Sequence, residues 1–172
     1  SIAAPTAAYS LRSLTGGDPK VVRVRRDSDN SEQDFTASGV SSGALVDFVG
    51  SGNNGFVETW YDQSGNGNDA VQATAANQPK IVSAGSLVVD SSGVPELEFD
   101  GSNDVLSAGT GFASSSKTIF CVNNPDSLSS NGLFAFGSSQ TDRLFAQYTS
   151  NLIRTEINGA QAGVSAATQK NL

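Results

Sequence analysis

The sequence predicts an all-β protein, built as an antiparallel β-sandwich or jelly roll. Short segments rich in Val, Ile, Phe and Thr recur along the chain, and turn residues separate them about every 8 to 12 residues. Glycine occurs 18 times and charged residues make up only 16% of the chain, a composition that favours strands and turns over helices. With 172 residues the chain can bury a sizeable core. We therefore expect one sandwich domain over residues 9–172, after a linker at residues 1–8.

The elements of the first half follow from local patterns. Alternation over residues 21–26 places Val22 and Val24 on one face of a strand. Arg23 and Arg25 then lie on the opposite face. In chain order, we expect a short helix or strand at 9–14, strands at 21–26 and 34–36, a weak helix at 41–49 and a strand at 56–61.

The second half keeps the same rhythm of short strands and turns. Cys121 cannot form an internal disulfide, and its apolar neighbours predict a buried thiol. The strands are expected at 79–82 and 86–89 around an Ala84-Gly85 turn, at 96–100, 117–122, 132–137 and 143–148, and at 152–157 before the hairpin signal Asn158-Gly159.

The polar loop 62–69, which follows the aromatic strand 56–61, is the first candidate site. Its side-chain oxygens suit Ca²⁺, and the aromatic residues before it could stack on a sugar. The alternative is a turn that hydrogen-bonds to itself beside a buried Trp60, and this structural interpretation is favoured. The candidate ligand-binding residues are Trp60, Tyr61, Asp62, Gln63, Asn66, Asn68 and Asp69, with Asp62, Asn66, Asn68 and Asp69 as the calcium candidates.

A stripe of carboxylates, Glu96, Glu98 and Asp100, is the second candidate site. Period-2 alternation directs all three to one face of a strand, with Leu97 and Phe99 on the other. Alternate side chains start about 6–7 Å apart, which suits the carboxyl pairs of glycosidases. The alternative, which is favoured, is a solvated acidic face of a half-exposed strand.

A third cluster joins arginines and aspartates around the end of the strand 21–26. Arginine forks match the carboxylate of an acidic sugar. Surface ion pairing across strands is the favoured alternative. The cluster consists of Arg23, Arg25, Arg26, Asp27 and Asp29.

Charge and composition exclude several classes of function. The net charge of −7 and a pI near 4.3 argue against a nucleic-acid partner or an anionic membrane surface. No segment is long and apolar enough to predict membrane insertion. The chain has no histidine, which removes serine–histidine catalysis and the commonest zinc ligand. We expect no resident cofactor, with calcium as the one alternative.

Two motifs carry a resemblance to known proteins. YDQSGNGNDAVQA (61–73) and ELEFDGSNDVL (96–106) resemble the laminin-G-like, concanavalin A-like jelly roll. With Ala8-Tyr9-Ser10-Leu11-Arg12 and the Arg26-x-x-Asp29 element, the first half is similar to the catalytic domain of α-L-arabinofuranosidase B. Similar stretches occur in phage tail and fibre proteins and in bacterial surface proteins. The arabinofuranosidases carry a disulfide-rich frame, whereas this chain has one cysteine, and their catalytic carboxylate segments have no counterpart after Asp104.

The resemblance implies two functions from different classes. The favoured one is a lectin-like carbohydrate-binding or structural module of a phage appendage or bacterial surface, with a glycan or other surface proteins as partners. The alternative is a glycoside hydrolase of the arabinofuranosidase type that uses Glu96, Glu98 or Asp100. Because no closing strand pattern follows Asn158-Gly159, we expect an open sheet edge, a longer polypeptide and a homo-oligomer.

Overall fold

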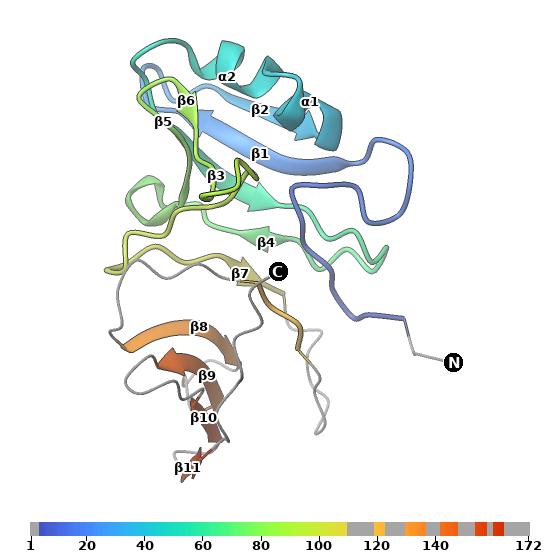
Figure 1. Cartoon of the computed structure of the whole chain (residues 1–172), viewed down its shortest axis with the longest axis vertical. Coiled ribbons are helices and arrows are strands. Elements are labelled where there is room, and N and C mark those ends of the chain that lie inside the picture. The colour runs from blue at the N-terminus through green and yellow to red at the C-terminus, as the bar shows by residue number, and fades with distance from the viewer. Residues whose placement is uncertain are drawn as a thin grey trace. The chain divides into compact units, whose positions relative to one another are not determined.

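The computed structural model describes residues 4–109, 119–122, 130–136, 142–147, 154–157 and 160–163 (Figure 1). Within these ranges short strands dominate, and helices are few and brief. In chain order the elements are β1 (Lys20–Arg26), β2 (Glu32–Thr36), α1 (Ala37–Ser41), α2 (Ala44–Val49), β3 (Gly55–Trp60), β4 (Ala70–Val71), the 3₁₀ turn η1 (Ala75–Asn77), β5 (Lys80–Ser83), β6 (Ser86–Leu87), β7 (Ser107–Ala108), β8 (Ser130–Phe136), β9 (Asp142–Gln147), β10 (Arg154–Ile157) and β11 (Ala160–Gly163).

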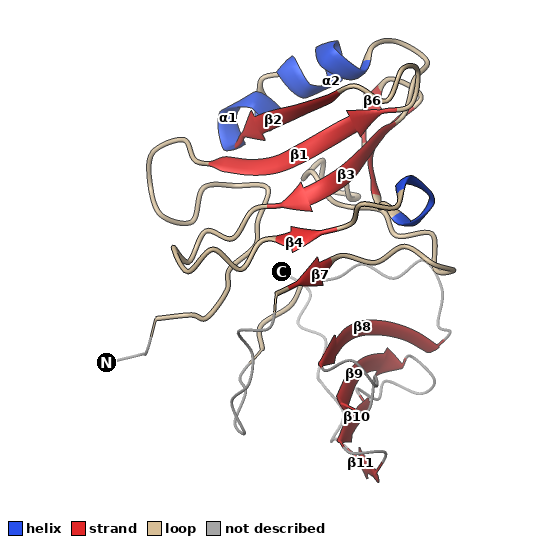
Figure 2. Cartoon of the chain, turned by 180° about the vertical axis from the view of Figure 1, so that it is seen from behind, coloured by secondary structure: helices blue, strands red, loops and turns tan. Residues whose placement is uncertain are grey.

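The first compact unit, Ser1–Ser114, is built on one antiparallel sheet (Figure 2). Its strands follow the order β2-β1-β3-β4-β7, and β5 joins β3 to β6. One edge of β3 pairs with β1. The other edge is shared, since β5 pairs with the start of β3 at Gly55 and Phe56, and β4 pairs with its end at Thr59 and Trp60. β3 is therefore the central strand of this unit.

The second unit, Ser115–Leu172, contains a separate antiparallel sheet with the order β11-β10-β9-β8. Its strands β8, β9 and β10 lie close to the positions expected at 132–137, 143–148 and 152–157. Ile157 pairs with Ala160, which confirms the hairpin predicted from the Asn158-Gly159 signal. Both units are thus mostly antiparallel sheet, which confirms the all-β expectation at this level.

The core of the first unit lies between its sheet and the two short helices (Figure 1). Leu45 and Val49 are four residues apart on α2, so both point to the same side, and both are fully buried. In β3 the residues Gly55, Val57 and Thr59 are buried, whereas the residues between them are half-buried on the opposite face. This alternation fixes which side chains of β3 face the helices and which face the outer side of the sheet.

In β1 burial is more extensive than simple alternation predicts. Val22 and Val24 are fully buried, as expected for one face of the strand. Val21 and Arg25 are also buried, although Arg25 was expected on an outer face. The pairing of β1 with β3 shifts register between Arg23 and Val24. The Arg25 side chain lies over the Phe56 ring and donates to Gln78.

The hairpin predicted around Ala84-Gly85 is present as β5 and β6. Both turn residues have positive φ, 49° at Ala84 and 81° at Gly85. A Cβ at Gly85 would lie 2.8 Å from the backbone nitrogen of Gly52, so glycine is required by the close approach of two chain segments as well as by the turn.

Three local predictions are wrong. Residues 9–14 form neither helix nor strand. The segment 96–100 contains only an isolated bridge from Glu98 to Lys80, and Phe99 is 46% exposed rather than buried, because the chain turns away at Asp100 instead of continuing along β5. Cys121 is exposed and outside any strand, because the described residues 119–122 pair with no neighbouring segment.

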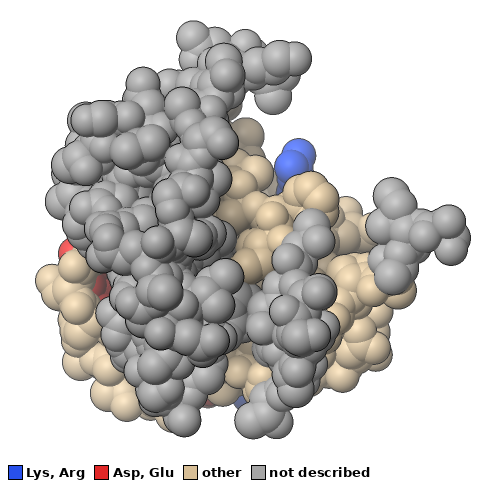
Figure 3. All heavy atoms as spheres, turned by 90° about the horizontal axis from the view of Figure 1, so that it is seen from below, with Lys and Arg blue, Asp and Glu red and all other residues tan. Residues whose placement is uncertain are grey.

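In Figure 3 the described atoms are mostly uncharged, and the charged side chains visible there do not gather into a patch. Among the described residues, no helix combines the length and the apolar character that a bilayer span requires.

Candidate functional site

The loop 62–69 uses its polar side chains to hold the chain together. The Asp62 carboxylate accepts hydrogen bonds from the backbone nitrogens of Ala8 (2.9 Å), Ser64 (2.8 Å) and Asn68 (3.0 Å), and from the Ser64 hydroxyl (2.7 Å). Asp69 in turn accepts from the backbone nitrogen of Asp62. Burial alone would raise the pKa of Asp62, but these hydrogen bonds outweigh it and lower the pKa.

The amides of this loop bind the N-terminal segment. The Asn66 and Asn68 side chains donate to the Thr6 carbonyl, at 3.1 and 2.8 Å. The buried Gln63 side chain accepts a hydrogen bond from the backbone nitrogen of Leu14 at 2.8 Å. It donates to the carbonyls of Ser10 at 2.9 Å and Arg12 at 3.0 Å. These contacts are those of a turn that hydrogen-bonds locally and also fastens a distant segment of the chain.

The two aromatic residues before the loop, Trp60 and Tyr61, are half-buried. The rings of Trp60 and Tyr9 have centroids 5.7 Å apart, and the Trp60 indole packs against the core cluster. The Tyr61 hydroxyl donates to Asp34 at 2.7 Å. Burial and then this hydrogen bond raise the pKa of Tyr61 to about 12. Both rings therefore have structural partners within the protein.

In the part of the chain that the structure describes, no group of three or more His, Cys, Asp or Glu side chains is arranged to hold a metal ion. The hydrogen bonds given above engage the side chains of the calcium candidates Asp62, Asn66, Asn68 and Asp69 within the protein.

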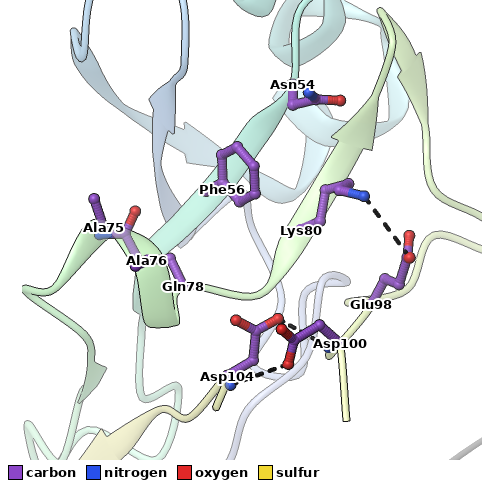
Figure 4. A pocket seen from close by; sticks show the side chains of 9 residues that line it. All are labelled: Asn54, Phe56, Ala75, Ala76, Gln78, Lys80, Glu98, Asp100 and Asp104. Carbon is purple, nitrogen blue, oxygen red and sulfur yellow. Dashed lines mark hydrogen bonds and ion pairs between the residues drawn. The ribbon is translucent and has the colours of Figure 1, made fainter. Parts of the chain in front are cut away.

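A different group of residues lines a pocket on the outer face of the first unit (Figure 4). It has a volume of about 380 Å³ and combines carboxylates, amides, one lysine and one aromatic ring. We call it the acidic pocket. It is lined by Asn54, Phe56, Ala75, Ala76, Gln78, Lys80, Glu98, Asp100 and Asp104.

The pairing of β5 with the segment after β6 fixes one wall of the acidic pocket. Lys80 and Glu98 exchange two backbone hydrogen bonds, of 2.8 and 2.9 Å, which place their side chains next to each other. The Lys80 ammonium lies 3.8 Å from a carboxylate oxygen of Glu98. Because both side chains are partly exposed, this pair contributes little to stability and remains accessible to a ligand.

The turn at residues 100–104 forms another wall of the acidic pocket (Figure 4). One oxygen of Asp100 accepts from the backbone nitrogens of Ser102, Asn103 and Asp104, and the backbone nitrogen of Asp100 donates to Asp104 at 2.9 Å. The Asn103 amide donates to the Ala76 carbonyl at 3.1 Å, which fastens the turn to η1. The two aspartates are therefore held at one place by the turn itself.

The pKa values of the two aspartates are shifted in opposite directions. Hydrogen bonds from Ser102 and Asn103 lower the pKa of Asp100. Burial, followed by the nearby charge of Asp100, raises the pKa of Asp104. Pairs of carboxylic acids whose environments separate their pKa values are characteristic of acid–base sites.

Phe56 provides the apolar surface of the acidic pocket. The buried Arg25, its cross-strand neighbour, lies over the ring with its guanidinium carbon 5.0 Å from the centroid. Arg25 also donates to the Gln78 side chain at 2.8 Å. Arg25 thus supports two lining residues from inside the protein.

The structure brings only part of the predicted site into the acidic pocket. Glu98 and Asp100 line it, whereas Glu96 does not. Sequence reasoning missed Asp104, although the spacing Asp100-Gly-Ser-Asn-Asp104 is a turn signal that brings residues i and i+4 together. It also missed Phe56, Gln78 and the pairing of Lys80, which depend on contacts between distant segments.

Only part of the third sequence cluster forms surface ion pairs, since Arg25 is buried and donates to Gln78 and Asn30. Arg26 pairs with Asp29 at 2.6 Å, and Arg23 pairs with Asp34 at 2.7 Å. Asp27 instead accepts from the backbone and side chain of Asn54.

No family model matches this chain, and comparisons with curated proteins and with solved structures also found no match.

Proposed function

We propose that this chain is a carbohydrate-binding module and that the acidic pocket is its binding site. The supporting observation is that the Phe56 ring and the carboxylates of Glu98, Asp100 and Asp104 line one pocket of about 380 Å³. Carboxylates accept hydrogen bonds from sugar hydroxyls, and an aromatic ring packs on the apolar face of a sugar. A pocket of this size holds one or two sugar rings.

The charges of the acidic pocket favour neutral or amino sugars. Its carboxylates belong to Glu98, Asp100 and Asp104, and its lining includes the cation Lys80. Acidic sugars would meet a net negative field in this pocket. We therefore expect hexoses, pentoses or amino sugars to bind, and uronic or sialic acids to be rejected.

The proposal also covers how the two sheets pack and where the protein acts. We infer that the two antiparallel sheets belong to a concanavalin A-like jelly roll, and that the protein acts on a phage appendage or a bacterial surface, as part of a homo-oligomer. The sequence motifs at 61–73 and 96–106 support this inference. An experimental structure tests it, because a jelly roll requires the two sheets to pack face to face.

A glycan array tests the binding proposal. The chain should bind a defined set of neutral or amino glycans, and Asp104→Asn or Phe56→Ala should remove that binding. Asp47→Asn is the matched control, since it removes the same charge from α2, whose residues do not line the acidic pocket. Arrays with calcium and with chelator separate a metal-dependent site from the metal-independent binding that we expect.

Two results would contradict the binding proposal. One is an array without reproducible signal from a folded protein. The other is binding that survives Asp104→Asn and Phe56→Ala but disappears on Trp60→Ala with no loss of stability, which would move the site to the aromatic pair beside the loop 62–69.

The opposite pKa shifts of Asp100 and Asp104 favour glycoside hydrolysis as a second candidate function. Asp104, protonated to a higher pH, would donate a proton to the leaving oxygen. The ionised Asp100 would activate water or attack the anomeric carbon.

Aryl glycosides, including aryl arabinosides, test this function. Turnover that Asp100→Asn and Asp104→Asn each abolish, and Glu96→Gln leaves intact, would make the protein an enzyme. Absence of turnover would leave the binding function alone.

A further inference from the structure

Arg25 is a buried cation without a carboxylate partner in the part of the chain that the structure describes. The residue is only 9% exposed. The ion pairs among the described residues involve other cations, namely Lys20, Arg23, Arg26 and Lys80. Burying a charge without an opposite charge is costly, and an apolar side chain of similar size often fills such a place with no loss of stability. The guanidinium of Arg25 therefore needs an explanation other than stability.

The hydrogen bonds of Arg25 lead to one side of the acidic pocket. Its Nε donates to the Gln78 side chain at 2.8 Å, and its Nη2 donates to the Ala75 carbonyl at 3.4 Å. Both partners line the pocket, and Ala75 is the first residue of η1. The remaining nitrogen, Nη1, donates to Asn30 at 2.9 Å, in the turn between β1 and β2, which fixes the guanidinium from a second direction.

The same guanidinium supports the aromatic wall of the pocket. Phe56 pairs directly with Arg25 across β1 and β3, and the guanidinium carbon lies 5.0 Å from the centroid of the ring. A cation over an aromatic ring is attracted to it, so the contact holds the ring in one place. One side chain therefore contacts both the aromatic wall and the wall formed by Gln78 and η1.

The wall formed by η1 also carries the turn at residues 100–104. The Asn103 side chain donates to two groups of η1, the Ala76 carbonyl at 3.1 Å and the Asn77 side chain at 2.6 Å. The two aspartates at the ends of this turn hold each other through its backbone. η1 thus links the buried guanidinium to the turn, and its place determines where the two carboxylates lie.

We propose that Arg25 is the positioning residue of the acidic pocket, which holds the Phe56 ring and, through η1, the turn at residues 100–104 in fixed places. In this role Arg25 contacts no sugar and acts only through the residues that line the pocket. Walls that are fixed before binding lower the entropic cost of ordering a ligand. The effect on sugars rests on the carbohydrate binding proposed above, whereas the places of the walls can be measured without a ligand.

Amide and aromatic chemical shifts of the free protein test the positioning role. Arg25→Lys keeps the charge but cannot donate to several acceptors in one plane or lie flat on a ring. We expect shifts at Phe56, in η1 and also at Asn103 and Asp104, to which Arg25 does not bond. The raised pKa of Asp104 should fall toward the ordinary value of an aspartate, because a loosened turn exposes its carboxylate.

Arg26→Lys is the matched control, since it makes the same change at the next residue of β1. Arg26 also lies over an aromatic ring, with its guanidinium carbon 5.0 Å from the Phe48 centroid, and it donates to the Phe48 carbonyl and to Asp29. Neither of these partners lines the acidic pocket. The control should leave the shifts of Asn103 and the pKa of Asp104 unchanged.

An array of neutral and amino oligosaccharides gives the second measurement. Arg25→Lys should weaken the binding of the glycans that the wild type binds by about tenfold, and Arg26→Lys should not. Asn103→Ala changes an exposed residue and cuts the link from η1 to the turn, so it should lower the pKa of Asp104 and weaken binding in the same way. Adding Arg25→Lys to Asn103→Ala should change the pKa of Asp104 little further, because both substitutions act on one link.

The two proposals fail in different ways. If Arg25→Lys moves the walls as expected but the wild type gives no signal on the array, carbohydrate binding is rejected and the positioning role stands. If the wild type binds glycans and Arg25→Lys binds them equally well, the positioning role is overturned and carbohydrate binding stands. The positioning role is also overturned if Arg25→Lys changes the shifts and the pKa of Asp104 no more than Arg26→Lys does.

Discussion

Gly55 illustrates how tightly the core of the first unit is packed. It is buried at the start of β3, and a Cβ there would lie 2.8 Å from a methyl of Val49 and 3.2 Å from side-chain atoms of Val24 and Val82. All three neighbours are stiff, fully buried valines. Gly55→Ala should therefore destabilise the protein by about 1–3 kcal/mol, although alanine lowers the entropy of the unfolded chain.

Chemical denaturation of the Gly55→Ala variant measures this effect. Gly109→Ala is the control, because a Cβ at Gly109 meets no atom of the described residues within 4 Å. The control should be neutral or slightly stabilising. If both variants have the same free energy of unfolding, the valines can move apart and the packing argument fails.

At the scale of elements, the side chain of Gln63 fastens the segment 10–14 to the loop 62–69. Gln63 makes three hydrogen bonds to residues 10–14, and it is only 7% exposed. Gln63→Ala leaves one backbone nitrogen and two carbonyls without these partners, which should cost about 2–3 kcal/mol. The backbone amide of Leu14 should then exchange its hydrogen much faster.

Hydrogen exchange distinguishes a local effect from general destabilisation. In Gln63→Ala, the protection of the amides in β1 and β3 should fall only as far as the loss of global stability requires. The protection of the Leu14 amide should fall further. Gln63→Glu should have an intermediate effect, since a carboxylate still accepts from Leu14 but cannot donate to Ser10 and Arg12. Uniform loss of protection in Gln63→Ala would show that Gln63 does not brace this segment specifically.

Much of the element pattern could be predicted because it is local. Alternation located β1, and the turn pairs Ala84-Gly85 and Asn158-Gly159 located two hairpins. Segment 9–14 failed because its conformation is set by Gln63, some fifty residues further along the chain. Segment 96–100 failed because alternation of side chains does not reveal where pairing ends, and Asp100 begins a turn.

The candidate site was predictable only in part, for the same reason. Glu98 and Asp100 were selected as carboxylates on one face of a strand, but the structure joins Asp100 to Asp104 by a turn and joins Glu98 to Lys80 by strand pairing. The loop 62–69 was predicted as a candidate site because its residues are chemically versatile. The hydrogen bonds that occupy them reach residues 5–14, which no local pattern indicates.

For the whole molecule, the absence of histidine predicts a flat stability profile around neutral pH. Between about pH 6 and 8, few side chains should titrate. In acid, the aspartates with lowered pKa decide the outcome. Arg23 lowers the pKa of Asp34, and Arg26 lowers the pKa of Asp29. A lowered folded pKa contributes stability above the unfolded value, about 3.9, which is lost as the pH falls below it.

Urea midpoints measured from about pH 8 down to pH 2.5 test this prediction. The midpoint should stay level to about pH 5 and then fall. Asp34→Asn should lower the free energy of unfolding at neutral pH by about 1 kcal/mol. It should also make the fall of the midpoint in acid shallower. Asp104 acts in the opposite sense, because its raised pKa makes the folded state more stable when it is protonated, and Asp104→Asn should therefore steepen the net decline. A steep change near pH 6.5 would contradict the expected plateau.

At the alkaline end, two tyrosines should limit the stability of the whole molecule. Burial, and then the charges of Asp62 and Asp69, raises the pKa of Tyr9 to about 12, and burial together with Asp34 raises that of Tyr61 to about 12. Unfolded tyrosine titrates near pH 10, so the contribution is complete below about pH 10 and is lost as the pH rises through about 12. Ultraviolet titration of tyrosinate should show delayed ionisation in the folded protein. Tyr9→Phe and Tyr61→Phe should each flatten the alkaline fall of the urea midpoint, whereas an unchanged slope in both variants would mean that other groups cause it.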